Sequence, residues 1–181
     1  MRKILIIGSA GAGKSVLSVR LAGLLQLPVL HLDALHWLPG WERPERDQWH
    51  KTVSDLVQGD SWIMDGNYDG TLEIRLEACD TVILLDLART VCLYRVLKRT
   101  ITYYGKSRRD LNPGCREQLP DWEFLSWIWN YPRANIPRVL ALLQSYEVQR
   151  EIFIFRTRRD VRRFVSEIAA GVDAPDRVAL L

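Results

Sequence analysis

The stretch that most constrains this chain is a glycine-rich octet, Gly-Ser-Ala-Gly-Ala-Gly-Lys-Ser, at residues 8–15. It matches the pattern G-x-x-x-x-G-K-[ST] at every fixed position. The apolar, mostly β-branched run at 4–7 is typical of a strand buried on both faces of a parallel sheet, and the apolar residues at 16–25 predict a helix. Strand, loop and helix therefore follow in the order that a phosphate-binding loop requires.

Such a loop binds phosphates with its own backbone. Glycines adopt positive φ angles and approach phosphate oxygens closely, so successive N–H groups point into a concavity at the positive N-terminus of the helix. Lys14 adds a charge for the β- and γ-phosphates, and the Ser15 hydroxyl suits Mg²⁺. The alternative, a glycine turn beside a surface lysine, is less favoured. We expect ATP and Mg²⁺ as cofactors, bound by Gly8, Ser9, Ala10, Gly11, Ala12, Gly13, Lys14, Ser15, Val16 and Arg156.

Length and composition predict one α/β domain over 1–170 with a lid insert at about 103–120 and a tail at 171–181. No stretch approaches the ~20 apolar residues of a membrane span. The first strand begins too early for a signal peptide, and the cysteines are widely spaced and odd in number. We expect a cytoplasmic protein with free thiols at Cys79, Cys92 and Cys115.

Alternating elements favour a parallel sheet with crossing helices. The predicted strands are 3–7, 28–32, 61–64, 81–85 and 151–155. The predicted helices are 14–25, 46–58, 70–77, 90–102, 121–131, 135–145 and 159–170. The 103–120 stretch is interrupted by glycines and prolines, and a loop of this length is typical of a lid over an active site.

Carboxylates follow three of the predicted strands, at the sheet edge where ligands bind in open parallel sheets. Asp65 is the better candidate for Mg²⁺, because Asp86 precedes a predicted helix that it can cap. Asp33 either orients or deprotonates an acceptor hydroxyl or caps a short turn. For His31 and His36, which flank Asp33, packing or hydrogen bonding is favoured over a metal site.

Aromatic residues cluster in two segments. Trp37 and Trp41 in "HWLPGW" either stack on a ligand ring or form a local core. The segment "DWEFLSWIWNYPR" has no single apolar face, and we expect a buried helix under the lid rather than a stacking platform.

The formal net charge is only +3, but basic residues concentrate between 89 and 116, where Asp110 is the single acid. Guanidinium groups match the oxygens of a transferring phosphoryl group, although for any one arginine a solvated surface position is the alternative. Arg95 and Arg99 are spaced i, i+4 and are predicted to share a helical face toward the lid. Arg133, Arg138 and Arg156 are weaker candidates.

Taken together, these residues resemble the adenylate-kinase-like P-loop kinases, and within them the topology-modulation or adenylate-kinase-related branch. The resemblance runs through "GSAGAGKS", "LDALHWLPGW", "WIMDGNYDGT", "DTVILLDLARTVCLYRVLKR", "GKSRRDLNPGCRE" and "FLSWIWNYPR". It implies a three-layer P-loop NTPase fold with a five-stranded parallel sheet in the order 2-3-1-4-5. It also implies that Asp65 is the Mg²⁺-linked carboxylate, that Arg95 and Arg99 reach the transferring phosphate, and that Asp33 and Arg75 face the acceptor.

The chain departs from that family at two points. The segment Asp-Gly-Asn-Tyr at 65–68 replaces the Asp-Gly-Phe-Pro-Arg of adenylate kinases, so the arginine that grips a monophosphate is missing and adenosine monophosphate is a doubtful acceptor. Only Cys115 lies in the predicted lid, so no zinc is expected. The residues expected around the acceptor are Asp33, Trp37, Asn67, Tyr68, Arg75, Arg108, Arg109 and Arg133.

The leading interpretation is an ATP-dependent phosphotransferase for a nucleoside, nucleotide or other small molecule, expected as a monomer. Its predicted catalytic residues are Lys14, Asp33, Asp65, Arg95 and Arg99, with Ser15 and Asp65 as metal ligands. The alternative, suggested by the family's label, is a nucleotide-dependent regulatory or DNA-binding module that acts on DNA topology. The lack of an appended binding motif or a strongly basic face counts against it.

Overall fold

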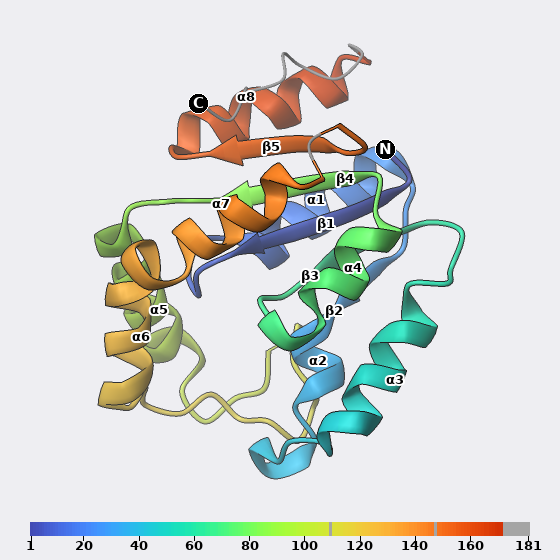
Figure 1. Cartoon of the computed structure of the whole chain (residues 1–181). Helices are drawn as coiled ribbons and strands as arrows, with labels where there is room; N and C mark the ends of the chain where they lie inside the picture. The colour runs from blue at the N-terminus through green and yellow to red at the C-terminus, as the bar shows by residue number, and fades with distance from the viewer. Residues whose placement is uncertain (109, 147, 172–181) are drawn as a thin grey trace.

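The structure is a computed structural model that describes residues 1–108, 110–146 and 148–171. Arg109 and the segment 172–181 lie outside the described residues, and so do the expectations placed on them. Five parallel strands form one sheet in the order β2-β3-β1-β4-β5, which confirms the predicted order (Figure 1). The strands are β1 (Lys3–Gly8), β2 (Val29–His31), β3 (Trp62–Asp65), β4 (Thr81–Leu85) and β5 (Glu151–Phe155).

Helices cover both faces of this sheet and make three layers (Figure 1). One face carries α3, α4 and α7, the other carries α1, α5 and α8, and α6 adds one fully buried side chain to each apolar core. The helices are α1 (Lys14–Leu25), α2 (Leu32–His36), α3 (Arg46–Leu56), α4 (Leu72–Ala78), α5 (Arg89–Tyr103), α6 (Trp122–Ala134), α7 (Ile136–Gln144) and α8 (Arg158–Ala169).

The central strand β1 shows how the sequence produces two cores. Leu5 and Ile7 pack into the core beneath α3, α4 and α7, whereas Ile4 and Ile6 pack into the core beneath α1, α5 and α8. Successive side chains of a strand point to opposite faces, so a continuous apolar run is required where both faces are covered. All four of these side chains are at most 1% exposed.

The segment after β2 differs most from the sequence-based expectation. The predicted strand 28–32 ends at His31, because Leu32 begins the short helix α2, which was not predicted. A 3-10 turn at Pro39–Trp41 follows, with Gly40 at a φ of 79°. Helix α6 also continues past its predicted end to Ala134, with Pro132 inside it.

The three cysteines are free and buried. Among the residues that the structure describes, no helix has the length and apolarity needed to cross a membrane.

Candidate active site

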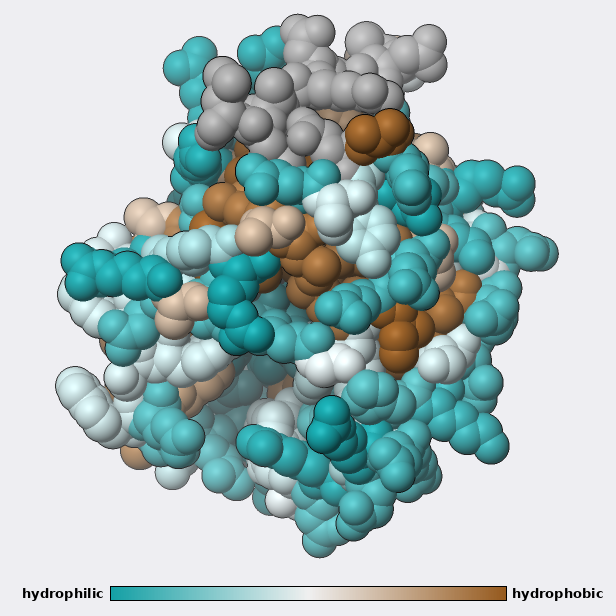
Figure 2. Space-filling view, viewed as in Figure 1, coloured by the Kyte–Doolittle hydropathy of each residue, from teal (hydrophilic) through white to brown (hydrophobic). Residues whose placement is uncertain are grey.

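A cavity of about 1070 Å³ opens at the carboxyl ends of the strands. Its walls come from the glycine-rich loop, from the segment around α2, from α5, α6 and α8, and from residues 104–108 and 110–120, which we call the covering loop. Figure 2 shows a hollow in the lower part of the molecule, rimmed mainly by hydrophilic side chains. Ligands of open parallel sheets bind at this end of the strands, so the cavity is the candidate active site.

The glycine-rich loop lies between β1 and α1 as predicted, and residues 10–16 line the cavity. Gly13 caps α1 with a φ of 102°. Gly11 has a φ of 77°, and a Cβ there would overlap the carbonyl oxygen of Cys92 in α5. The loop therefore packs closely against α5, which an alanine in the same place would prevent.

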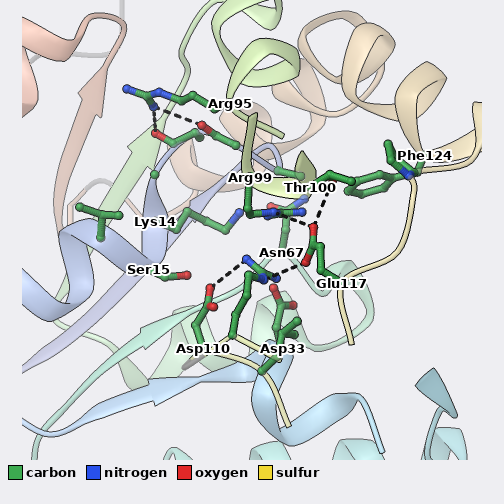
Figure 3. Close-up of a pocket in the computed structure, with 18 of the residues that line it drawn as sticks. Lys14, Ser15, Asp33, Asn67, Arg95, Arg99, Thr100, Asp110, Glu117 and Phe124 are labelled. Atoms are coloured by element: carbon green, nitrogen blue, oxygen red, sulfur yellow. Dashed lines mark hydrogen bonds and ion pairs between the residues drawn. The ribbon is translucent and has the colours of Figure 1, made fainter. Parts of the chain in front are cut away.

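The side chain of Lys14, near the end of the glycine-rich loop, lies at the cavity (Figure 3). Its Nζ donates hydrogen bonds to the carbonyl oxygens of Gly8, at 2.8 Å, and Ser9, at 3.0 Å. Burial lowers the pKa of Lys14, while the negative charges of Asp33 and Asp65 act in the opposite direction. These two carbonyls hold the ammonium group of Lys14 against the glycine-rich loop.

Asp65 has partners other than those expected of a direct metal ligand. It is 2% exposed and lies outside the cavity lining. Its Oδ2 accepts hydrogen bonds from Ser18 Oγ at 2.5 Å and from His31 Nδ1 at 2.8 Å. The hydrogen bond to Asp65 raises the pKa of His31, against an opposing effect of burial. We therefore interpret Asp65 as a fixed negative charge near Lys14.

The donor set for Mg²⁺ at this site is correspondingly small. Ser15 lines the cavity beside Lys14 (Figure 3). Within the described part of the chain, no three His, Cys, Asp or Glu residues are grouped so that they could hold a metal ion. Mg²⁺ in nucleotide sites keeps several waters and binds through one or two protein oxygens and the phosphates, so one hydroxyl fits this chemistry.

Two arginines of α5, Arg95 and Arg99, contact different loops. Arg95 Nη1 donates to the carbonyl oxygens of Gly11, at 3.1 Å, and Ala12, at 2.9 Å (Figure 3). Arg95 therefore lies on the glycine-rich loop rather than against the covering loop, where it was expected. Arg99, one turn later, does face the covering loop. Its Nε lies 3.1 Å from Glu117 Oε1.

Glu117 of the covering loop joins three side chains, although nothing in the sequence pattern pointed to it. Its carboxylate pairs with Arg99 and with Arg108 Nε, at 2.9 Å from Oε2, and accepts a hydrogen bond from Thr100 Oγ1 at 3.3 Å. Arg108 also pairs with Asp110 at 3.4 Å. Glu117 is 5% exposed, so its carboxylate is largely desolvated.

The covering loop reaches across the cavity to the 37–41 segment. Trp41 Nε1 donates to the carbonyl oxygen of Arg116 at 2.9 Å, and Gly40 N donates to that of Gly114 at 3.2 Å. A Cβ on Gly114 would come within 2.5 Å of Pro39 Cβ. The covering loop and the 37–41 segment therefore pack closely together and close one side of the cavity.

The remaining wall carries Asp33, Trp37, Asn67 and Tyr68, all four expected near the acceptor. Tyr68 donates its hydroxyl hydrogen to Asp33 Oδ1 at 2.8 Å. Asn67 Oδ1 accepts from the Tyr131 hydroxyl at 2.9 Å, and its Nδ2 is buried without a hydrogen-bond partner. Burial raises the pKa of both tyrosines, so the two hydroxyls stay protonated and act as donors.

Several expected site residues lie elsewhere. Arg75 is fully buried and donates to the carbonyl oxygens of Thr71, Gly66 and Tyr68, so it supports the backbone rather than facing an acceptor. Burial lowers the pKa of Arg75 to about 10, which still leaves it charged near neutral pH. Arg156 is mostly exposed and pairs with Asp86 at 3.7 Å.

Arg133 is exposed and, like Arg75 and Arg156, lies outside the cavity lining. The expectation of a buried aromatic helix is also wrong for part of α6. Trp122 is 82% exposed, while Trp127 and Phe124 line the cavity. Ile128 and Tyr131 occupy the buried stripe of this helix, which leaves the tryptophans at other positions on its circumference.

The structure adds cavity residues that sequence reasoning missed. Arg158 and Arg162 of α8 line the cavity in place of Arg156, and Arg20 of α1 and Arg43 also contribute. The i, i+4 spacing of Arg158 and Arg162 after the last strand was the available signal.

No family model matches the sequence, and no curated protein matches it. Among solved structures, a gluconokinase from Sinorhizobium meliloti 1021 has a TM-score of 0.52 at 13% identity, over 94% of this chain and 91% of the gluconokinase. A deoxyadenosine kinase from M. mycoides with bound dCTP has a TM-score of 0.48 at 13% identity, over 93% of this chain and 98% of that one. The gluconokinase likeness extends over nearly the whole length of both chains. The protein therefore shares the three-layer α/β fold of this gluconokinase.

Proposed function

We propose that this protein is an ATP-dependent phosphotransferase that acts on a small molecule with the help of Mg²⁺. The observation that carries the proposal is the arrangement around Lys14. The ammonium group lies in a glycine-rich loop between β1 and α1, with Arg95 and Arg99 at the same cavity. The fold shared with a gluconokinase agrees with this chemistry.

Positioning and charge neutralisation supply most of the rate in phosphoryl transfer. The backbone N–H groups of 8–15 would hold the phosphates, and Lys14 would exchange its loop carbonyls for the β- and γ-phosphate oxygens. Arg99 would turn from Glu117 toward the charge that develops on the transferring group. Bound Mg²⁺ would be held by Ser15 and the phosphates, and it would neutralise developing charge.

The covering loop acts as a lid in this proposal. It contacts the 37–41 segment through backbone and side-chain hydrogen bonds, and it carries Glu117 and Arg108 into the cavity. A loop held in this way excludes water from the transferring phosphoryl group, which would otherwise be hydrolysed. Release of those hydrogen bonds would open the cavity for exchange of nucleotide.

The test combines nucleotide binding with product formation. We expect a calorimetric titration with Mg²⁺·ATP to give saturable heat, and we expect ATP consumption to depend on an added acceptor. Lys14→Ala should lower kcat by about 10²–10³-fold, as loss of one charge-stabilising donor does. The control is Lys51→Ala, on the exposed surface of α3, which should match the unaltered protein.

Two outcomes would contradict the proposal. One is the absence of nucleotide binding by folded protein. The other is slow ATP hydrolysis that no acceptor accelerates, together with salt-sensitive DNA binding, which would favour the regulatory alternative.

A further inference from the structure

The wall formed by Asp33, Trp37, Trp41, Asn67 and Tyr68 is here called the acceptor end of the cavity. We propose that it binds a neutral ring compound that carries hydroxyl groups, a nucleoside or a sugar, and that Asp33 accepts the proton of the hydroxyl that becomes phosphorylated. This inference rests on the proposed phosphotransferase function and specifies its acceptor.

One carboxylate oxygen of Asp33 accepts a hydrogen bond within the protein, and the other is available to a ligand. Oδ1 accepts the hydrogen bond from Tyr68, whose raised pKa keeps that hydroxyl protonated. Oδ2 has no hydrogen bond to any of the described residues. Asp33 lies below Lys14 and Arg99 in Figure 3, and its charge interacts with Lys14. A carboxylate oriented in this way, in the same cavity as the glycine-rich loop, can act as a general base.

Asn67 offers hydrogens at the same end. Tyr131 occupies its Oδ1, which fixes the amide so that Nδ2 is the free group. Nδ2 is buried without a partner, and an unpaired buried donor is costly. Asn67 lines the cavity, so a small turn of its side chain would let a hydroxyl or carbonyl oxygen of a ligand accept a hydrogen bond from Nδ2. Both open hydrogen-bonding groups at this end thus suit a neutral polar molecule.

The charges at this end disfavour a phosphorylated acceptor. A phosphate monoester carries about two negative charges near neutral pH and would face the Asp33 carboxylate. Arg108 is paired with Glu117, Arg99 would serve the transferring phosphoryl group, and Arg75 is buried on backbone carbonyls. Within the described part of the chain, the cation left at this end is Arg43, which lies over the Trp37 ring at 5.1 Å.

The aromatic residues at the cavity favour a ring. Trp37 and Trp41 meet edge to face with centroids 5.4 Å apart, and both line the acceptor end. Phe124 and Trp127 of α6 also line the cavity, with parallel rings 6.1 Å apart. Aromatic side chains bury the flat face of a base or the apolar face of a sugar, whereas an extended charged chain would gain little from them.

The chemical step balances within these groups and ATP. The acceptor O–H bond breaks as its proton passes to Asp33 Oδ2, and the oxygen lone pair forms a bond to the γ-phosphorus. The bond from that phosphorus to the β–γ bridging oxygen breaks, and ADP leaves with the electron pair. Asp33 then returns the proton to solvent.

The first experiment compares three acceptor classes with Mg²⁺·ATP: nucleosides, neutral sugars and nucleoside monophosphates. We expect a phosphorylated product from one of the first two, with kcat/KM at least about 100-fold above that for any monophosphate, as for an acceptor class whose charge the site leaves unpaired. The arm that reacts distinguishes nucleoside from sugar. Equal or better phosphorylation of a monophosphate would overturn the inference. So would nucleotide binding without product in any arm.

The second experiment tests Asp33 itself. Asp33→Asn should lower kcat by about 10²–10⁴-fold, the range for loss of a general base. The affinity for Mg²⁺·ATP should change by less than about threefold, because the phosphate loop is intact. Asp55→Asn, on the exposed surface of α3, is the matched control and should leave both unchanged.

These measurements separate the two levels of the proposal. Full kcat in Asp33→Asn, or a parallel loss of nucleotide affinity, would overturn the role of Asp33 while the phosphotransferase stands. Failure of the unaltered protein to bind nucleotide would instead remove the proposed function.

Discussion

The two ends of the cavity are built from different parts of the chain. At the phosphate loop, one continuous segment supplies backbone groups, and the glycines that permit its shape are visible in the sequence. At the acceptor end, side chains come from α2, from the 37–41 segment and from the turn after β3, and tyrosines orient two of them. A backbone site is sensitive to substitutions that change the shape of the loop, whereas a side-chain site can alter its ligand by single substitutions.

The largest effect on stability should come from adding one methyl group to the backbone-built end. Gly11→Ala places a Cβ against the Cys92 carbonyl at a positive φ, so the free energy of unfolding should fall by about 1–3 kcal/mol. Urea denaturation measures it. Gly23→Ala in α1 is the control, because its Cβ would meet nothing within 4 Å and should raise stability by about 0.5–1 kcal/mol. Equal stability of the two variants would mean that the glycine-rich loop can change its backbone conformation at little cost, which would contradict the proposed difference between the two ends.

Glu117 lies between the two ends, and its replacement should have the next largest effect. Glu117→Gln removes the charge that aligns Arg99 and Arg108, so kcat should fall by about 10–30-fold, equivalent to about 1.4–2 kcal/mol. Steady-state phosphotransfer assays measure it, with the exposed Glu73→Gln of α4 as control. Unchanged or increased kcat would show that Glu117 only restrains the arginines.

The same division explains what the sequence predicted. The bounds of β4, β5 and α1 agree with those expected, and the sheet order is confirmed, because buried strands and a helix after a glycine loop have strong local patterns. The glycine-rich loop lies where its pattern indicated. These features depend on neighbours along the chain.

The misses depend on neighbours in space. Arg75 is of a residue type that often binds phosphate, yet it donates its hydrogen bonds to three backbone carbonyl oxygens inside the fold. Glu117 was given no role from the sequence, and the folded covering loop brings it to Arg99 and Arg108. The exposure of Trp122 follows from which stripe of α6 faces the cores. The periodicity of a single sequence does not show which distant residues come into contact in the folded protein.

At the side-chain-built end, Tyr68→Phe should have a moderate effect. It removes the hydrogen bond to Asp33 Oδ1 and keeps the ring, so kcat should fall by roughly fivefold, equivalent to about 1 kcal/mol. Nucleotide affinity, measured by calorimetry, should not change. Tyr94→Phe removes a hydroxyl from an exposed ring of α5 and serves as control. A loss of nucleotide affinity in Tyr68→Phe would show that the two ends are not separable.

The smallest effect concerns pH at the acceptor end. The His36 ring contacts the rings of Trp49 and Tyr68, and its Nδ1 is buried without a hydrogen-bond partner. Burial, aided by the charge of Arg43, lowers the pKa of His36 below its ordinary value of 6.5. The unfolded chain therefore binds this proton more readily, so the stability from a neutral His36 is present above about pH 6.5 and is lost as the pH falls toward the lowered pKa.

His36→Phe should remove that dependence while retaining a ring. Urea denaturation at pH 7 and pH 5 should show the unaltered protein losing more stability on acidification than the variant, by less than about 1 kcal/mol. The other histidines, His31 and His50, are the same in both proteins, so the difference between the two pH changes isolates His36. A larger acid loss in His36→Phe would reverse the sign, and it would mean that the folded acceptor end stabilises the charged ring.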